Sequence, residues 1–222
     1  MQDCRLAAHD LACRRGDRLL FQGLSLALGP GDALRIEGPN GVGKSSLIRI
    51  LAGLLPPFAG PVERQGAIGL IDERPSLDPQ LSLIRALAFW RRIDGAGEEA
   101  LARLGLAELA DVPVRYLSTG QRKRAAFARL LGQRATIWLL DEPLNGLDAA
   151  AARLVETLTA EHCAAGGLCV VASHQPFALA GMRAIELAHF APPASGRGRG
   201  WASTPREEDA HPNPSRREGL SL

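Results

Sequence analysis

The stretch that decides the fold reads GPNGVGKS, from Gly38 to Ser45, and fits the pattern G-x-x-x-x-G-K-[ST] of a phosphate-binding loop. The residues before it, ALRI at 33–36, predict a buried strand, and the residues after it, SSLIRILA at 45–52, predict a helix. The motif depends on this strand–loop–helix context, so a glycine-rich turn beside an ordinary lysine is the weaker alternative. The sequence therefore predicts a site for the phosphates of a nucleotide.

The residue types in the loop explain how it would bind phosphate. Glycines let the backbone take conformations that a side chain forbids, so successive N–H groups can turn inward and form a concave anion site. The N-terminus of the following helix adds positive potential. Lys44 suits the β- and γ-phosphates, and the Ser45 hydroxyl suits a Mg2+ ion. The nucleotide-binding residues predicted here are Gly38, Pro39, Asn40, Gly41, Val42, Gly43, Lys44, Ser45 and Ser46.

Two carboxylates follow a second apolar stretch, IWLL at 137–140. Asp141 can hold Mg2+ through water, opposite Ser45. Glu142 is then placed to polarise the attacking water as a general base. The alternative is a pair of solvated acids at a strand end, which the phosphate-binding loop makes less favourable. We predict Glu142 and Lys44 as catalytic residues, and Ser45 and Asp141 as metal ligands.

A second anion site is predicted where LSTGQ, at 117–121, precedes a basic helix. A serine hydroxyl, a glycine N–H and a helix N-terminus together can bind an anion. One nucleotide has a single γ-phosphate, so two such sites need an explanation. In isolation the segment is better interpreted as a helix cap, with Ser118 or Thr119 at the N-cap and no ligand.

Size, charge and cysteine content limit the remaining possibilities. The 222 residues suggest one domain, or one domain and a tail. A formal net charge of +2 gives no strong attraction to nucleic acid, and no nucleic-acid partner is expected. Four cysteines without C-x-x-C spacing favour buried free thiols in a reducing compartment over a metal site. With neither a secretory signal nor an apolar run of about 18 residues, we expect a soluble cytoplasmic protein that reaches a membrane only through a partner.

The order of apolar segments predicts the architecture. Residues 5–13, 19–21 and 24–28 predict antiparallel strands, with a turn at 14–18. From 33 to 188 strands alternate with helices, which indicates an α/β fold with a mainly parallel sheet and helices on both faces. Helical spacing in 81–109 indicates a helical subdomain inserted at about 76–130. The domain is expected to span 1–190, and the tail at 191–222, rich in Pro, Gly and Arg, is expected to be disordered.

Taken jointly, the motifs GPNGVGKS, LSTGQ, LLDEP, GLD at 146–148 and SH at 173–174 resemble the nucleotide-binding domain of ATP-binding-cassette (ABC) transporters, in order and in spacing. The resemblance implies a P-loop NTPase fold of the ABC-ATPase type, with an antiparallel β subdomain, and it implies ATP and Mg2+ as ligands. It further implies a head-to-tail dimer with a second copy, in which each ATP lies between the loop of one copy and LSTGQ of the other. The residues implied to face nucleotide at that interface are Ser118, Gly120, Gln121 and Asp148, with His174 contacting the γ-phosphate as a catalytic residue.

Longer segments, such as IEGPNGVGKSSLIRILAGLLPPFAG and ASHQP, resemble those of one branch of the family, which serves haem export and c-type cytochrome biogenesis. That branch implies an ATPase at the cytoplasmic face of the inner membrane, coupled to a separate transmembrane permease subunit. Three alternatives stay open: the ATPase subunit of another exporter, a soluble cassette ATPase acting on ribosomes, DNA or iron–sulfur assembly, and a degenerate cassette kept as a binding module.

The chain departs from the family pattern in two places. Where an aromatic residue usually stacks on adenine, the sequence has Arg15, with Phe21 nearby, so the adenine contact stays unassigned. Where a glutamine usually senses Mg2+ and the permease, the sequence has Arg74, and Gln80 comes too late. Because arginine cannot ligate Mg2+, its role would be to bind a phosphate or a carboxylate of the partner.

Overall fold

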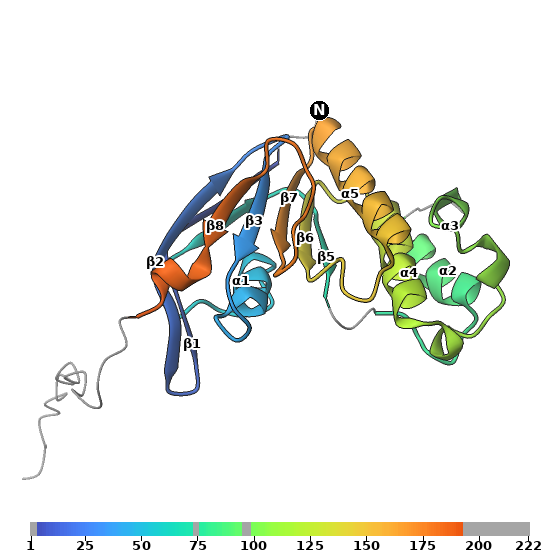
Figure 1. Cartoon of the computed structure of the whole chain (residues 1–222), viewed down its shortest axis with the longest axis horizontal. Helices are drawn as coiled ribbons and strands as arrows, with labels where there is room; N and C mark the ends of the chain where they lie inside the picture. The colour runs from blue at the N-terminus through green and yellow to red at the C-terminus, as the bar shows by residue number, and fades with distance from the viewer. Residues whose placement is uncertain (1–3, 73–75, 95–98, 193–222) are drawn as a thin grey trace, which may run out of the picture. The chain divides into compact units, whose positions relative to one another are not determined.

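A five-stranded parallel sheet forms the centre of the computed structural model, which describes residues 4–72, 76–94 and 99–192 (Figure 1). Its strand order is β5-β6-β7-β3-β8. Every neighbouring pair is parallel. The strands β6 and β7 are buried throughout, as expected for the middle of a sheet that is covered on both faces. The bounds of the five strands are β3 Ala33–Glu37, β5 Ile68–Ile71, β6 Ile137–Asp141, β7 Leu168–Ala172 and β8 Arg183–Glu186.

A second, antiparallel sheet has the order β2-β1-β4, with β1 at Arg5–Arg15, β2 at Arg18–Leu28 and β4 at Val62–Gln65. The predicted turn at 14–18 was too long, since only Gly16 and Asp17 separate the two long strands. The strand β4 was not predicted, because its sequence VERQ is polar. It is an edge strand, and its three polar side chains are exposed.

Alternate residues of the central strands serve two separate cores. Ile137 and Leu139 pack with α1 (Lys44–Leu51) and with the antiparallel sheet. Trp138 and Leu140 pack in the other core, together with α5 (Ala149–Ala164). Successive strand side chains point to opposite faces, so α1 and α5 cover opposite faces of the parallel sheet. The prediction of an α/β sheet with helices on both faces is confirmed.

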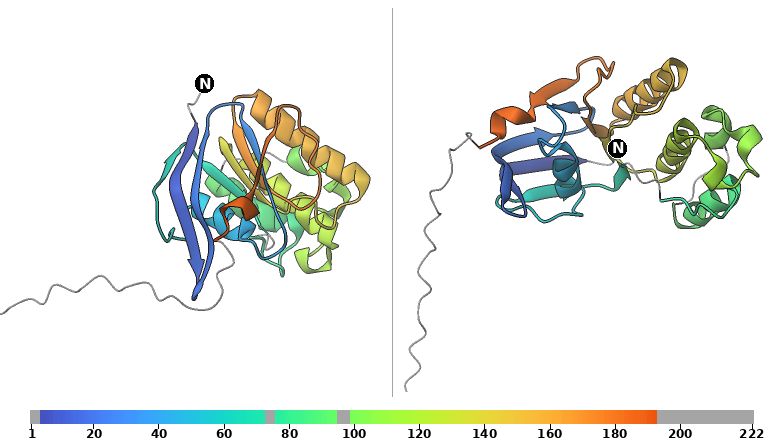
Figure 2. Two further views of the ribbon diagram at one scale, coloured as in Figure 1. Left: turned by 60° about the vertical axis from the view of Figure 1, so that its left-hand side comes forward. Right: turned by 60° about the horizontal axis from the view of Figure 1, so that its bottom comes forward.

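Residues between β5 and β6 are mainly helical and join the same core as α5. They form α2 (Leu83–Asp94), α3 (Glu99–Arg103), 3-10 turns at Ala107–Leu109 and Val114–Tyr116, and α4 (Thr119–Gly132). Figure 2 shows these helices, in green, grouped together. A last 3-10 turn follows β8 at Leu187–Phe190. The subdomain boundary at about 76–130 stays a prediction, and Arg74 and the tail beyond residue 192 lie outside the described residues.

Three predicted motifs are brought to one edge of the parallel sheet by its topology. The phosphate-binding loop follows β3, Glu142 follows β6, and His174 lies two residues beyond β7. In parallel sheets the carboxyl ends of all strands meet at the same edge, where ligands bind. All four cysteines are buried, as expected. Within the described ranges, no helix is long and apolar enough to cross a bilayer.

Candidate functional site

The phosphate-binding loop lies close against neighbouring strands, and two of its glycines are required there. Gly38 has a φ of 135° and Gly43 a φ of 118°, a region that side chains disfavour. A Cβ on Gly43 would lie 3.2 Å from the ring of Phe21. A Cβ on Gly38 would lie 2.8 Å from Glu186 Oε1. A side chain at either position would be strained by its φ, and at Gly43 it would also crowd the buried Phe21 ring.

The loop presents several backbone amides that have no carbonyl partner. Leu47 N–H donates to the Gly43 carbonyl at 2.9 Å, and Val42 N–H donates to the Pro39 carbonyl at 3.3 Å. In the parts of the chain that the structure describes, the amides of Gly41, Gly43, Lys44 and Ser45 donate to no main-chain carbonyl. The first amides of a helix have no acceptor within it, and they attract an anion.

The Lys44 side chain folds back over its own loop. Its Nζ donates to the Gly38 carbonyl at 2.6 Å and to the Pro39 carbonyl at 3.3 Å. It also lies 4.0 Å from Glu142 Oε1, and the Lys44 side chain is only 7% exposed. Phosphate oxygens are stronger partners for an ammonium than neutral carbonyls, so Lys44 can exchange these contacts for a phosphate.

A cavity of about 420 Å3 opens above the loop. It joins loop residues to side chains from the ends of β6 and β7. Leu20 and Asn145 also line it, and the sequence reasoning had missed both, because neither residue type signals phosphate chemistry. The lining residues are Leu20, Asn40, Gly41, Gly43, Lys44, Ser45, Ser46, Glu142, Asn145 and His174.

A second cavity lies beside the first and also takes part of its lining from the phosphate-binding loop. Gly38, Pro39 and His174 line this cavity, which has a volume of about 330 Å3. Val42, by contrast, packs against the core that contains α1, so its side chain faces away from both cavities. A ligand in either cavity could therefore contact only the main chain of Val42.

Glu142 is held from several sides. Its Oε2 lies 2.9 Å from His174 Nδ1, and its N–H donates to the Ala172 carbonyl at 2.8 Å. Its φ is 47°, a left-handed conformation that costs an L-residue about 1–2 kcal/mol. The Glu142 side chain is 13% exposed and His174 is 45% exposed. A carboxylate oriented in this way beside a water-accessible cavity can act as a general base.

The residues present fit a Mg2+ ion that arrives with a nucleotide. Ser45 offers a hydroxyl to the cavity, and Asp141, the residue before Glu142, ends β6 as a buried carboxylate. The described residues contain no group of three or more His, Cys, Asp or Glu side chains that could hold a metal. Mg2+ is commonly bound by one or two protein oxygens together with phosphate and water, and this donor set suits that mode.

The N-terminus of α4 is closed by a capping box. Gln121 N–H donates to Ser118 Oγ at 3.2 Å, and Ser118 N–H donates to Gln121 Oε1 at 2.7 Å. A Cβ on Gly120 would lie 2.7 Å from the Gly146 carbonyl. The helix-cap interpretation of LSTGQ is therefore correct for a single copy. Asp148 is likewise an N-cap, accepting from Ala151 N–H at 2.8 Å at the start of α5.

The structure narrows the choice of adenine contact. Phe21 is fully buried, at 0% exposure, and its ring lies under Gly43. Phe21 therefore cannot present a face to a base, which removes one of the two residues considered. Arg15 is exposed at the end of β1, outside the cavity lining. Leu20, the neighbour of Phe21, is the apolar side chain that reaches the cavity.

Gln80, the glutamine nearest to residue 74 in the sequence, bonds away from the phosphate-binding loop. Its side-chain oxygen accepts a hydrogen bond from Arg115, and its main-chain N–H donates one to Asp78 Oδ1. It does not line the cavity above the loop. Arg74 itself lies outside the described residues.

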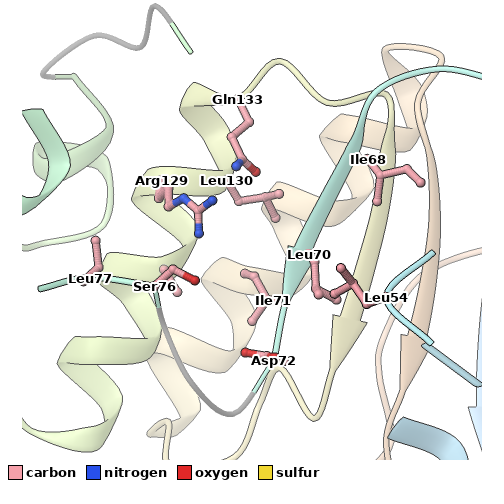
Figure 3. A pocket seen from close by; sticks show the side chains of 11 residues that line it. Leu54, Ile68, Leu70, Ile71, Asp72, Ser76, Leu77, Arg129, Leu130 and Gln133 are labelled. Atoms are coloured by element: carbon pink, nitrogen blue, oxygen red, sulfur yellow. The ribbon is translucent and has the colours of Figure 1, made fainter. Parts of the chain in front are cut away.

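A further hollow of about 270 Å3 lies between β5 and α4, lined by residues that precede and follow segment 73–75 (Figure 3). Its lining is mixed, with aliphatic side chains beside Asp72, Arg129 and Gln133, and it extends to Leu54, which is 66% exposed. Arg129 adds a fixed cation, because its guanidinium lies 3.4 Å from the centre of the Trp90 ring. Figure 3 shows Leu54 beside Leu70, with Arg129 and Gln133 projecting from α4.

A parallel sheet with a phosphate-binding loop after β3 and a carboxylate pair at the end of β6 defines a P-loop nucleotide hydrolase. The chain belongs to the ABC transporter family, whose model matches residues 21–145. It is therefore an ABC ATPase and an ATP-binding protein.

Known relatives extend this likeness to almost the whole chain. The "Cytochrome c biogenesis ATP-binding export protein CcmA" of Novosphingobium aromaticivorans is 58% identical over 192 residues, which is 86% of this chain and 100% of that protein. The protein of the same name from Zymomonas mobilis is 50% identical, over 85% of this chain and 86% of its own length.

Solved structures agree with the fold. One, described as an inward-facing conformation of a metal-chelate type ABC transporter, has a TM-score of 0.67 at 28% identity, covering 78% of this chain and 74% of its own. An ATP binding subunit of an ABC transporter has a TM-score of 0.69 at 21% identity, covering 76% of this chain and 79% of its own, and supports the fold alone.

Proposed function

We propose that this chain is the ATP-hydrolysing subunit of an exporter that serves c-type cytochrome biogenesis, with haem as the cargo. The observation that carries the proposal is the 58% identity to a cytochrome c biogenesis export protein over that protein's full length. The described residues hold the elements that ATP hydrolysis needs, so a degenerate binding module is disfavoured. The chain would work at the inner face of the cell membrane, through a separate permease.

Hydrolysis is assigned to residues that surround one cavity. The loop amides and Lys44 would bind the phosphates, with Lys44 leaving the Gly38 and Pro39 carbonyls. Glu142 would accept a proton from a water whose oxygen attacks the γ-phosphorus, while the bond to the β–γ bridging oxygen breaks and ADP leaves. His174, 2.9 Å from Glu142, would orient that carboxylate and reach the γ-phosphate. Mg2+, held by Ser45 and by Asp141 through water, would neutralise phosphate charge.

The second half of the site is proposed to come from another copy of the chain. Ser118 is exposed at the start of α4, and a capped helix N-terminus retains positive potential. In a head-to-tail dimer, Ser118, Gly120 and Gln121 would close over the ATP bound by the partner's loop. Asp148, exposed at the start of α5, would lie at the same interface.

We infer that the permease binds at the hollow between β5 and α4. Its mixed lining, with aliphatic side chains next to polar ones, the exposed Leu54 and the fixed Arg129 suit a short amphipathic segment that carries a carboxylate. Leu54→Glu should abolish co-purification with the permease and leave the ATP affinity of the isolated chain unchanged. Retained co-purification would place the permease contact elsewhere.

Complementation tests the function as a whole. The gene for the 58% identical protein would be deleted in Novosphingobium aromaticivorans and replaced by the gene for this chain. We expect c-type cytochromes to return, as measured by haem staining of membrane proteins, and to stay absent with Glu142→Gln. ATPase activity without return of cytochromes would favour the subunit of another exporter.

A further inference from the structure

Lys123 is a buried cation that the proposed mechanism does not use. It lies on α4, and only 7% of the residue is exposed. Lysines are rarely buried to this extent unless they are paired, because an ammonium is costly to remove from water. Its Nζ donates a hydrogen bond to the main-chain carbonyl of Glu142 at 3.1 Å. The contact joins α4 to the residue proposed as the general base.

The main chain of Glu142 needs such a contact. Its φ of 47° is disfavoured for an L-residue, and the following Pro143 disfavours the right-handed helical alternative. The carbonyl accepts from Lys123 and, at 3.3 Å, from Asn145 N–H, while the Glu142 N–H donates to Ala172. Unusual backbone conformations persist where surrounding groups hold them. Any rotation about this residue would move its carboxylate away from His174.

We propose that Lys123 is a positioning residue, which fixes the main chain of Glu142 so that its carboxylate faces the attacking water. The inference rests on the proposed role of Glu142 as general base. Lys123 also lies on the helix that begins with Ser118, Gly120 and Gln121. The end of α4 proposed to close over the partner's ATP is thus joined through one helix to the general base of its own subunit.

A purely structural role for Lys123 is the competing explanation, and the chain offers a matched control for it. The adjacent Arg124 also uses its charged group to donate to a main-chain carbonyl, that of Leu104, at 2.9 Å. Arg124 belongs to the same helix, and its hydrogen bond lies away from Glu142. Lys123→Met and Arg124→Met therefore remove a comparable cation and hydrogen bond, and only the first affects the proposed general base.

The test is a double-mutant cycle on the full chain with its permease. Single-turnover hydrolysis of radiolabelled ATP would be measured for Lys123→Met with Glu142 and with Glu142→Gln. Residues that act through one another are not additive. We expect Lys123→Met to slow hydrolysis about tenfold when Glu142 is present and less than about twofold when Gln replaces it. ATP affinity should stay within about twofold of wild type.

Arg124→Met should show the same small effect in both backgrounds. Equal slowing by Lys123→Met in both backgrounds, or a rate within about twofold of wild type with Glu142 present, would overturn the proposal. Should Lys123→Met fail to fold by circular dichroism, Lys123→Gln takes its place in the same cycle. Failure of the underlying role of Glu142 looks different, because Glu142→Gln alone would then hydrolyse ATP at the wild-type rate.

Discussion

The cavity above the phosphate-binding loop and the N-terminus of α4 differ in how complete they are. In the cavity, three separate segments supply Lys44, Glu142 and His174, and Glu142 lies 4.0 Å from Lys44 and 2.9 Å from His174. At the start of α4, Ser118 and Gln121 bond each other in the capping box. One copy of the chain therefore joins three segments around one cavity and carries, elsewhere on its surface, a capped helix end.

Topology accounts for the difference. Parallel strands deliver their carboxyl ends to one edge, so residues far apart in the sequence meet there in every copy. The first amides of a helix lack partners within it, and in one copy of the chain a side-chain cap supplies one at α4. The comparison leads to three predictions that would break or sharpen the contrast between the two regions, and a fourth prediction concerns a residue outside both.

The largest effect should come from Glu142→Gln, which keeps the shape of the cavity and removes the base. General-base catalysis contributes about 10²- to 10⁴-fold, so the rate of hydrolysis should fall by that factor while ATP still binds. Steady-state ATPase assays and ATP binding by calorimetry measure the two quantities. Glu161→Gln, which removes a surface carboxylate paired with Arg103, is the matched control and should hydrolyse at the wild-type rate.

Lys44→Ala should have the next largest effect, and it should lower the affinity for ATP. A hydrogen bond to a charged group contributes about 1.5–3 kcal/mol, which corresponds to a loss of ATP affinity of about tenfold to a hundredfold. The helix should remain folded, because Lys44 is its first residue and its side chain bonds carbonyls of the loop. Unchanged ATP affinity in calorimetry would exclude Lys44 from the phosphate site.

Two substitutions at Ser118 distinguish its role as the helix cap from its proposed contact with the phosphate bound by the partner. Ser118→Ala removes the cap and should lower the free energy of unfolding by about 1 kcal/mol. Ser118→Asp keeps a good cap but places a negative charge where the phosphate would lie. In a Glu142→Gln background, size-exclusion chromatography with ATP should show a dimer when Ser118 is kept and a monomer for the Ser118→Asp variant. A dimer in both would contradict the head-to-tail arrangement.

The smallest effect lies outside both regions, at His162. Burial holds the pKa of this imidazole below its usual 6.5, although hydrogen bonds to the Leu168 and Thr136 carbonyls oppose the shift. The unfolded chain then binds the proton more readily, so this contribution to stability is present above pH 6.5 and is lost as the pH falls below it. His162→Phe can keep the stack on Trp138, whose ring centre is 4.0 Å away. The free energy of unfolding would be measured with urea at about pH 7.5 and about pH 5.5, on either side of the ordinary imidazole pKa. Between these two pH values it should fall less for His162→Phe than for the wild type, and an equal fall would contradict this explanation.

The cavity was largely predictable because its residues carry recognisable chemistry. Lys44, Ser45 and Glu142 were identified by motif, and parallel topology explains why the structure brings them together. Leu20 and Asn145 were missed because an aliphatic side chain and a turn amide gain a role only from their position. Lys123 was missed for the same reason, as its Nζ meets a carbonyl 19 positions later in the sequence.

Other differences have equally physical causes. Phe21 was a candidate for the adenine contact by its type alone, yet its place in β2 turns the ring into the core. The edge strand β4 escaped prediction because a polar edge strand lacks the alternation by which strands are recognised.

The sequence by itself determined the phosphate-binding loop, the carboxylate pair and the α/β class, because each depends on local residue chemistry and on short-range periodicity. Tertiary structure alone decided that Phe21 is buried, that Glu142 adopts a left-handed conformation facing His174, and that Lys123 holds its main chain. These facts depend on contacts between segments that are distant along the chain, and such contacts follow from packing, which no local pattern encodes.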